Sequence, residues 1–241
     1  MIENNKSVVI LSMQELKIIL QKHQQEYSKV VDLDAAKDKL CSIDLTAGNT
    51  ALSEEIINDT EKFSAYINTV LKNAGARYAI GGYGESRTLY RRSKLFDGTQ
   101  PRTVHLGIDV WGAAGTKVHA PLGGMVHSFA FNNDHGDYGA TVILQHQLET
   151  KVFHTLYGHL SLKDLDKLKE GKFITRGEVI GHFGEREENG DWPPHLHLQV
   201  IEDMRIKRGD YPGVCTLSES EKYLANCPNP DLLLNMARYL N

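Results

Sequence analysis

The 241-residue sequence has few cysteines, no long apolar run and no excess of positive charge. Its cysteines, Cys41, Cys215 and Cys227, are widely spaced and form no Cys-x-x-Cys pair, which argues against a disulfide framework or a structural zinc finger. No stretch approaches the roughly 20 apolar residues of a membrane span. Lys and Arg number 27 against 31 Asp and Glu, so no global positive field attracts nucleic acid. We therefore expect a protein of a reducing compartment that inserts into no membrane and binds no nucleic acid.

The N-terminus lacks the features of a secretion signal. Glu3 precedes the first basic residue, Lys6, and the apolar run from Val8 to Leu11 is too short for the hydrophobic region of a signal peptide. The expected location is therefore the cytoplasm, although a leader already removed would leave no trace in this sequence.

The first third of the chain is predicted to be helical. Ser12 and Glu15 form a capping box, and the apolar residues behind them recur on one helix face, which predicts a helix over 13–31. Ser53 is the expected N-cap of a second helix that ends at Gly75. These helices are interpreted as scaffold.

After His105 the sequence changes to short β-branched runs separated by glycine, which is typical of an antiparallel sheet or sandwich. The predicted strands are 116–120, 124–131, 140–146, 152–157, 178–183 and 196–201. A short helix is expected over 161–169, and Asn229 with Pro230 predicts a terminal helix. We divide the chain into a helical extension and linker (1–95), a β domain (96–205) and a C-terminal helical tail (206–241).

Histidine placement indicates where the chemistry lies, because ten of the eleven histidines fall between His105 and His197. His195 and His197 are two residues apart on a predicted strand and therefore project to the same side. With His105 and Asp109 they could form a zinc site of ordinary composition. From spacing alone, a hydrogen-bonded turn at 105–109 and a solvated strand face remain an equal alternative.

Several motifs in order resemble the lysostaphin/LytM-type zinc metallopeptidases, many of which cleave peptidoglycan cross-bridges or stem peptides. The motifs are His105-x-Gly-x-Asp109, Gly115-Thr-x-Val-x-Ala-Pro121, Leu156-Tyr-Gly-His-Leu160, Gly177-x-x-Ile-Gly181 and Pro194-His-Leu-His197. The segments Tyr90-Arg-Arg-Ser-Lys-Leu-Phe96 and Trp192-Pro-Pro-His-Leu-His197 also resemble, more closely, zinc-peptidase-like domains that some bacteria fuse to kinase-like and aminotransferase modules. The resemblance implies a mainly β fold with α-helices (α+β), in which an antiparallel sheet or sandwich of the duplicated-hybrid-motif type follows an N-terminal helical extension.

Carried over by position, the resemblance implies that His105, Asp109 and His197 bind Zn²⁺, with His159 and His195 beside the zinc-bound water. The expected activity is hydrolysis of a peptide or amide bond by zinc-activated water. The sequence contains no His-Glu-x-x-His segment and hence no obvious glutamate base, so a histidine is expected to transfer the proton.

Substrate contacts are predicted at Trp192, Tyr157 and Arg91. Trp192 lies in the segment 189–194, which replaces the family's usual Ser/Thr-Gly-rich approach to the His-x-His strand and could narrow the groove. Local packing explains Trp192 equally well. Arg91 could bind a carboxylate through two parallel hydrogen bonds.

Three alternatives remain open. The chain could be a cytoplasmic zinc hydrolase of a small amide or a non-catalytic, zinc-bound regulatory module. The units 120–126 and 171–181 also resemble the duplicated motif of the glucose-specific phosphocarrier, although a metal-binding carboxylate such as Asp109 has no role there.

Overall fold

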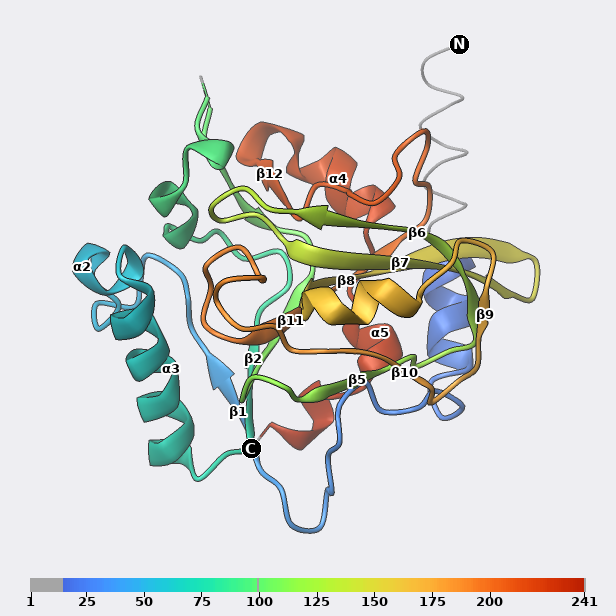
Figure 1. Cartoon of the computed structure of the whole chain (residues 1–241), viewed down its shortest axis with the longest axis horizontal. Coiled ribbons are helices and arrows are strands. Elements are labelled where there is room, and N and C mark those ends of the chain that lie inside the picture. Colours follow the sequence, from blue (N-terminus) through green and yellow to red (C-terminus); the bar gives the residue numbers. More distant parts are fainter. Residues whose placement is uncertain (1–14, 99, 241) are drawn as a thin grey trace.

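An eight-stranded sheet organises the computed structural model, which describes residues 15–98 and 100–240 (Figure 1). The strand order is β1-β2-β4-β11-β8-β7-β6-β9, and every neighbouring pair is antiparallel except β1 and β2. The strands are β1 (Leu40–Ile43), β2 (Tyr78–Gly81), β4 (Ile108–Trp111), β6 (Gly124–Asn132), β7 (Gly139–Leu148), β8 (Lys151–Leu160), β9 (Phe173–Ile174) and β11 (His195–Ile201).

Two small antiparallel sheets complete the β structure. β5 (Lys117–His119) pairs with β10 (Val179–His182), and β3 (Arg102–His105) pairs with β12 (Val214–Thr216). All six strands predicted from the β-branched runs are present within three residues of their expected ends. The mainly β, antiparallel α+β fold class is therefore confirmed.

The first predicted helix is shorter than expected. Residues 15–22 are helical and a turn follows at 23–26, while Ser12 and residues 13–14 lie outside the described part of the chain. The helix stops because the chain then turns toward the β domain, where the Ser28 amide donates to the Pro121 carbonyl. Leu16 and Leu20 are fully buried, as the helical periodicity predicts.

The second predicted helix is two helices, α2 (Glu54–Ile57) and α3 (Thr60–Ala74). The Asp59 carboxylate accepts hydrogen bonds from the backbone amides of Glu61 and Lys62, so it starts a new helix and interrupts the first. Ser53 caps α2 and the left-handed Gly75 ends α3, as expected.

The segment before residue 95 also supplies strands, because β1 and β2 extend the main sheet beyond β4. Each strand is only four residues long; β2 is buried throughout and β1 at both ends. Neither strand therefore has the alternation of buried and exposed residues that predicts a strand from sequence. Short 3₁₀ turns follow at η1 (Leu89–Arg92) and η2 (Lys94–Phe96). The helix expected over 161–169 is also a 3₁₀ turn, η3 (Leu162–Lys167).

Two short helices, α4 (Ser220–Asn226) and α5 (Asp231–Leu234), follow β12 in the C-terminal tail. The end of the tail is 3₁₀, at η5 (Ala237–Tyr239), as is η4 (Leu217–Glu219) before α4. Within the described residues, no helix has both the length and the apolar character needed to cross a membrane.

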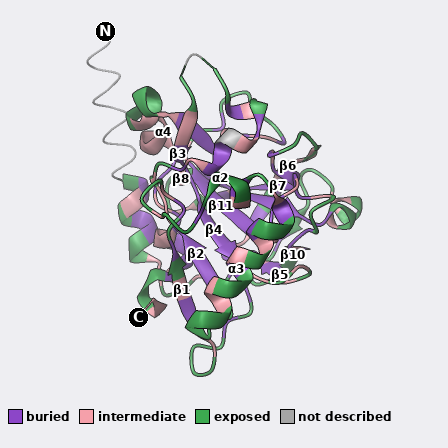
Figure 2. Cartoon of the chain, turned by 90° about the vertical axis from the view of Figure 1, so that its left-hand side faces the viewer, coloured by how far each residue is buried: buried purple, intermediate pink, exposed green. Residues whose placement is uncertain are grey.

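The central strands are buried, whereas the outer face of α3 is exposed (Figure 2). Phe63 of α3 packs against Trp111 of β4 with ring centroids 5.7 Å apart. The N-terminal segment thus covers one face of the sheet beside β4 and β11, the two strands that carry candidate site residues.

Candidate functional site

Three side chains that are far apart in the sequence meet at one point of the sheet. His105 ends β3, Asp109 lies in β4 and His197 lies in β11. The antiparallel register places Asp109 directly opposite His197. All three side chains are buried, and their candidate ligand atoms lie within 4.8 Å of one another.

The ligand atoms form a nearly equilateral triangle. His105 Nε2 lies 3.0 Å from His197 Nδ1 and 3.3 Å from Asp109 Oδ1. His197 Nδ1 and Asp109 Oδ1 are 3.1 Å apart. Ligands about 2.0 to 2.1 Å from a tetrahedral zinc ion are about 3.3 to 3.4 Å apart. The triangle therefore resembles one face of a zinc coordination tetrahedron, and the residues fit a three-ligand zinc site.

Hydrogen bonds on the outer ring nitrogens direct both imidazoles toward this triangle. His105 Nδ1 donates to the Gly82 carbonyl at 2.9 Å, and His197 Nε2 donates to the Gln199 side-chain oxygen at 3.0 Å. Gln199 is oriented by its own donation to the Pro212 carbonyl. The lone pairs of His105 Nε2 and His197 Nδ1 are consequently free for a metal ion.

A buried arginine supports the third ligand. Arg87 donates through Nη1 to the second carboxylate oxygen of Asp109, and its Nε lies 2.5 Å from Glu85 Oε1. Although burial favours the neutral acid, the charge that His105 carries when it is protonated and the permanent charge of Arg87 hold the pKa of Asp109 well below its ordinary value. Burial, with Arg87 next in importance, lowers the pKa of His105 to about 4. Asp109 is therefore charged and His105 neutral at neutral pH, as metal binding requires.

The glycine of the His105-x-Gly-x-Asp109 motif has a steric role. A Cβ atom on Gly107 would lie 2.6 Å from both Cε1 and Nε2 of His197 and from the Leu198 carbonyl oxygen. A residue with a side chain at this position would displace the His197 ring from the triangle.

His159 and His195 lie beside the triangle. Their Nδ1 atoms donate to the backbone carbonyls of Asn189 and Pro193, at 2.7 and 2.8 Å, which leaves each Nε2 with a lone pair. The ring centroids of the two histidines are 4.1 Å apart, and His195 Nε2 lies 4.0 Å from Asp109 Oδ1. Burial lowers the pKa of His195 to about 4, and burial with the neighbouring His195 lowers the pKa of His159 well below its ordinary value.

The backbone conformation of His159 brings its side chain to this side of the sheet. Gly158 pairs with His197, so strand alternation would place His159 on the opposite face with Tyr157. The left-handed φ of 62° at His159 reverses this direction.

Tyr157 keeps the regular alternation and points into the core. Its side chain is fully buried among apolar residues, and its hydroxyl lies 2.9 Å from Thr155 Oγ1. The expectation that Tyr157 contacts substrate is therefore wrong, because the side chain lies on the face of β8 away from the site.

Trp192 belongs to a loop fixed by Asn189. The Asn189 side chain bonds the Gly184 carbonyl and both the amide and the carbonyl of Trp192, at 2.9 to 3.1 Å. The Arg92 guanidinium lies 4.7 Å from the Trp192 ring and donates to Thr60 Oγ1 of α3. Trp192 is thus packed in place and also lines the pocket at the site, so its contact with substrate stays a prediction. The side chain of Arg91 lies outside the described part of the structure.

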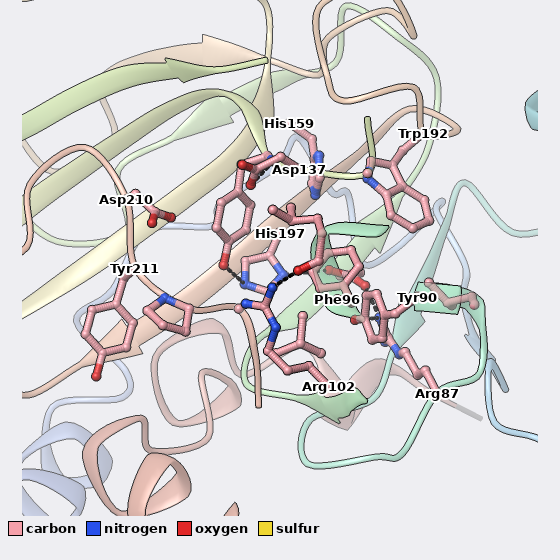
Figure 3. A pocket seen from close by; sticks show the side chains of 18 of the residues that line it. Arg87, Tyr90, Phe96, Arg102, Asp137, His159, Trp192, His197, Asp210 and Tyr211 are labelled. Carbon is pink, nitrogen blue, oxygen red and sulfur yellow. Dashed lines mark hydrogen bonds and ion pairs between the residues drawn. The ribbon is translucent and has the colours of Figure 1, made fainter. Parts of the chain in front are cut away.

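The pocket in front of the triangle has two unlike walls (Figure 3). Tyr90, Phe96 and Trp192 form an aromatic wall on one side, and Asp210 and Tyr211 lie on the other. Arg102 lies across the pocket in the same view, in front of His197. We call His159 and His195 the accessory histidines. A substrate segment entering this pocket would meet the triangle, the accessory histidines and the guanidinium of Arg102.

His146 is another buried histidine, and it lies in the core. Its Nδ1 bonds the Gly123 carbonyl and its Nε2 bonds Thr155 Oγ1, so both ring nitrogens have partners. It does not belong to the triangle.

Sequence reasoning missed Arg87, Arg102 and Gln199. Gln199 follows His197 by two residues on the same strand face, a signal that could have identified it as a neighbour of the ligand. Arg87 precedes Asp109 by 22 residues, and no local pattern distinguishes it from the adjacent arginines at 91 and 92.

Comparison with known proteins agrees with this geometry. Residues 103–208 match the sequence profile of peptidase family M23. The matched segment is less than half of the chain, and it is similar to this family of peptidases. It contains His105, Asp109, His159, His195 and His197. A search of the curated proteins gave no match.

Several solved structures are similar to this chain. The catalytic domain of lysostaphin from Staphylococcus simulans is 21% identical, with 71% of this chain and 97% of that one covered and a TM-score of 0.40. Csd3 from Helicobacter pylori is 26% identical over 52% of this chain and 32% of its own, with a TM-score of 0.34. A zinc-containing peptidase from Vibrio cholerae is 25% identical over 44% and 31%, with a TM-score of 0.33. The chain thus spans about a third of the length of the last two proteins.

Proposed function

We propose that the protein is a zinc-dependent metallopeptidase that hydrolyses a peptide or amide bond in the pocket beside His105, Asp109 and His197. The observation that carries the proposal is the triangle of ligand atoms 3.0 to 3.3 Å apart. Three protein ligands leave one tetrahedral position open, which is the arrangement of catalytic rather than structural zinc. Peptidoglycan-type peptides are the proposed substrates, because many lysostaphin/LytM-type enzymes cleave them.

The accessory histidines provide the proton transfer in this proposal. Zinc bound at the triangle would supply a Lewis acid that polarises an amide carbonyl and acidifies water. His159 and His195 are neutral because of burial, and each directs an Nε2 lone pair away from its backbone partner. One of them accepts the proton of the attacking water, and a protonated imidazole then donates to the leaving amine.

The test separates metal binding from proton transfer. We expect His105→Ala to lose stoichiometric zinc, whereas His159→Ala and His195→Ala keep zinc and lose turnover by roughly 10²-fold or more. Zinc content is measured by elemental analysis, and products are identified by mass spectrometry with muropeptides, oligoglycines and unmodified peptides, each with a chelated control. His119→Ala is the matched control, because His119 bonds Asp32 outside the pocket.

Two outcomes would contradict the proposal. Near-normal turnover of zinc-loaded His159→Ala would refute its role in proton transfer. Absence of any chelator-sensitive product would favour a small-amide hydrolase or a zinc-bound regulatory module.

A further inference from the structure

Arg102 is a charged side chain of the pocket that the proposed mechanism does not use. It begins β3, three residues before the metal ligand His105, and it lines the same pocket as His197. Figure 3 shows its side chain extending across the pocket in front of His197. Any substrate that reaches the triangle from this side passes the guanidinium.

The Arg102 guanidinium is held in place by η2. Its Nη2 donates to the Leu95 carbonyl, and its Cζ lies 5.1 Å from the centre of the Phe96 ring. A carbonyl and an aromatic face orient the guanidinium without neutralising its charge. Arg102 therefore has a defined position at little cost to its capacity to bind an anion.

No carboxylate of residues 15–98 or 100–240 lies within 4.0 Å of the Arg102 guanidinium. This distinguishes it from Arg87, which pairs with Asp109 and Glu85 in the same region. A guanidinium has five N–H donors arranged to match a planar carboxylate. Arg102 uses one of them on Leu95 and presents the others to the pocket or solvent.

Two carboxylates of the pocket limit how much negative charge a bound ligand can carry. Asp137 and Asp210 line the same pocket. Burial, with Asp210 and Asp134 adding to it, raises the pKa of Asp137 to about 6, while the charge of Arg102 acts in the opposite direction. Their negative charge disfavours phosphate or a dicarboxylate, which would bring two negative charges near them. A ligand with one carboxylate satisfies Arg102 with the least repulsion.

We propose that Arg102 binds a free carboxylate of the substrate, so that the enzyme is selective for peptides or amides that carry a single carboxylate close to the scissile bond. This inference rests on the proposed function, because it assigns a substrate class to the same pocket. Hydrogen bonds between a guanidinium and a carboxylate are charge-assisted and can be bidentate, so they distinguish an acid from its amide.

Tryptophan fluorescence reports on this pocket directly, because the chain contains two tryptophans and both Trp111 and Trp192 line it. N-acetylglycine and N-acetylglycinamide are titrated into the full chain with and without zinc. We expect the acid to bind the zinc-free protein roughly tenfold or more tightly than the amide. Arg102→Gln should abolish this preference and Arg102→Lys should keep part of it. The control Arg208→Gln should keep all of it, since Arg208 pairs with Glu170 at the surface.

Equal binding of acid and amide by the zinc-free protein would overturn the inference, as would an unchanged preference in Arg102→Gln. Cleavage is tested separately with pentaglycine and pentaglycine amide on the zinc-loaded chain. Acid-selective binding without any chelator-sensitive cleavage would contradict the proposed peptidase function and leave the carboxylate site standing. Cleavage of both peptides with equal kcat/KM, unaffected by Arg102→Gln, would retain the peptidase and refute the carboxylate site.

Discussion

Arg87 shows how a residue outside the ligand motif can determine the properties of a metal centre. Its guanidinium is 1% exposed and pairs with two carboxylates, Asp109 and Glu85. A lysine would preserve the charge but could not bond both partners with the same planar group. We expect Arg87→Lys to weaken zinc affinity by about 10- to 100-fold, as loss of a group that orients a ligand does.

Arg87→Met should have a second effect, because it leaves the buried carboxylate of Asp109 and the partly buried carboxylate of Glu85 without this cation. The expected loss of unfolding free energy is about 3 to 5 kcal/mol. Chelator competition measures the zinc affinity of Arg87→Lys. Urea unfolding of the zinc-free protein measures the stability of Arg87→Met. Unchanged zinc affinity in a folded Arg87→Lys protein would contradict the assigned role, and Arg208→Met is the surface control.

Gly107 illustrates a steric requirement at the same scale. Gly107→Ala places a methyl group 2.6 Å from the His197 ring, so we expect loss of stoichiometric zinc and about 1 to 3 kcal/mol of destabilisation. Gly48→Ala serves as control, since the nearest atom to a Cβ there is 3.4 Å away. Elemental analysis that finds one zinc per Gly107→Ala chain would show that the ring can move without losing the metal.

At the scale of elements, the accuracy of sequence-based prediction depended on how local the determinants are. β6, β7 and β8 contain continuous β-branched runs bounded by glycine, and their positions were predicted closely. β1 and β2 were missed because four residues carry too little periodicity and their pairing with β4 is set by tertiary contacts. The ligand set was predicted from the family resemblance. The direction of the His159 side chain depends on a left-handed backbone conformation that no residue pattern predicts.

The loop between β10 and β11 positions both accessory histidines. The Asn189 side chain makes three hydrogen bonds within the loop, and its carbonyl orients His159. We expect Asn189→Ala to retain zinc, to shift the emission of Trp192 to longer wavelength and to lower kcat by about tenfold or more, since misplacing a catalytic group is costly. A variant with normal kcat despite the emission shift would show that His159 is oriented by other contacts.

At the scale of the whole molecule, buried neutral histidines should make stability depend on pH. Burial lowers the pKa of His105, His146, His154 and His195 to about 4 in each case. In the unfolded chain these groups titrate near 6.5, so the unfolded state binds more protons between the two values. The raised pKa of Asp137 makes the folded state bind more protons than the unfolded state, which opposes the effect of the histidines. It is one group, whereas four histidines act in the other direction.

Metal-free protein should therefore be most stable above about pH 6.5 and should lose stability as the pH falls toward about 4. Each histidine contributes a slope of up to about 1.4 kcal/mol per pH unit. His146→Gln removes one buried histidine away from the metal ligands. It should reduce the slope of the unfolding free energy against pH by up to about 1.4 kcal/mol per pH unit. Urea unfolding at several pH values, with chelator present, measures this slope. An unchanged slope in His146→Gln would contradict the conclusion that burial keeps His146 neutral in the folded protein.

The order of the ligands along the chain has a consequence for biosynthesis. His105 and His197 are separated by 92 positions but must lie 3.0 Å apart to share a metal ion. At synthesis rates of about 5 to 20 residues per second, the first ligand is synthesised roughly 5 to 18 seconds before the last one. The complete three-ligand site therefore cannot capture a metal ion before β11 has been synthesised and has emerged.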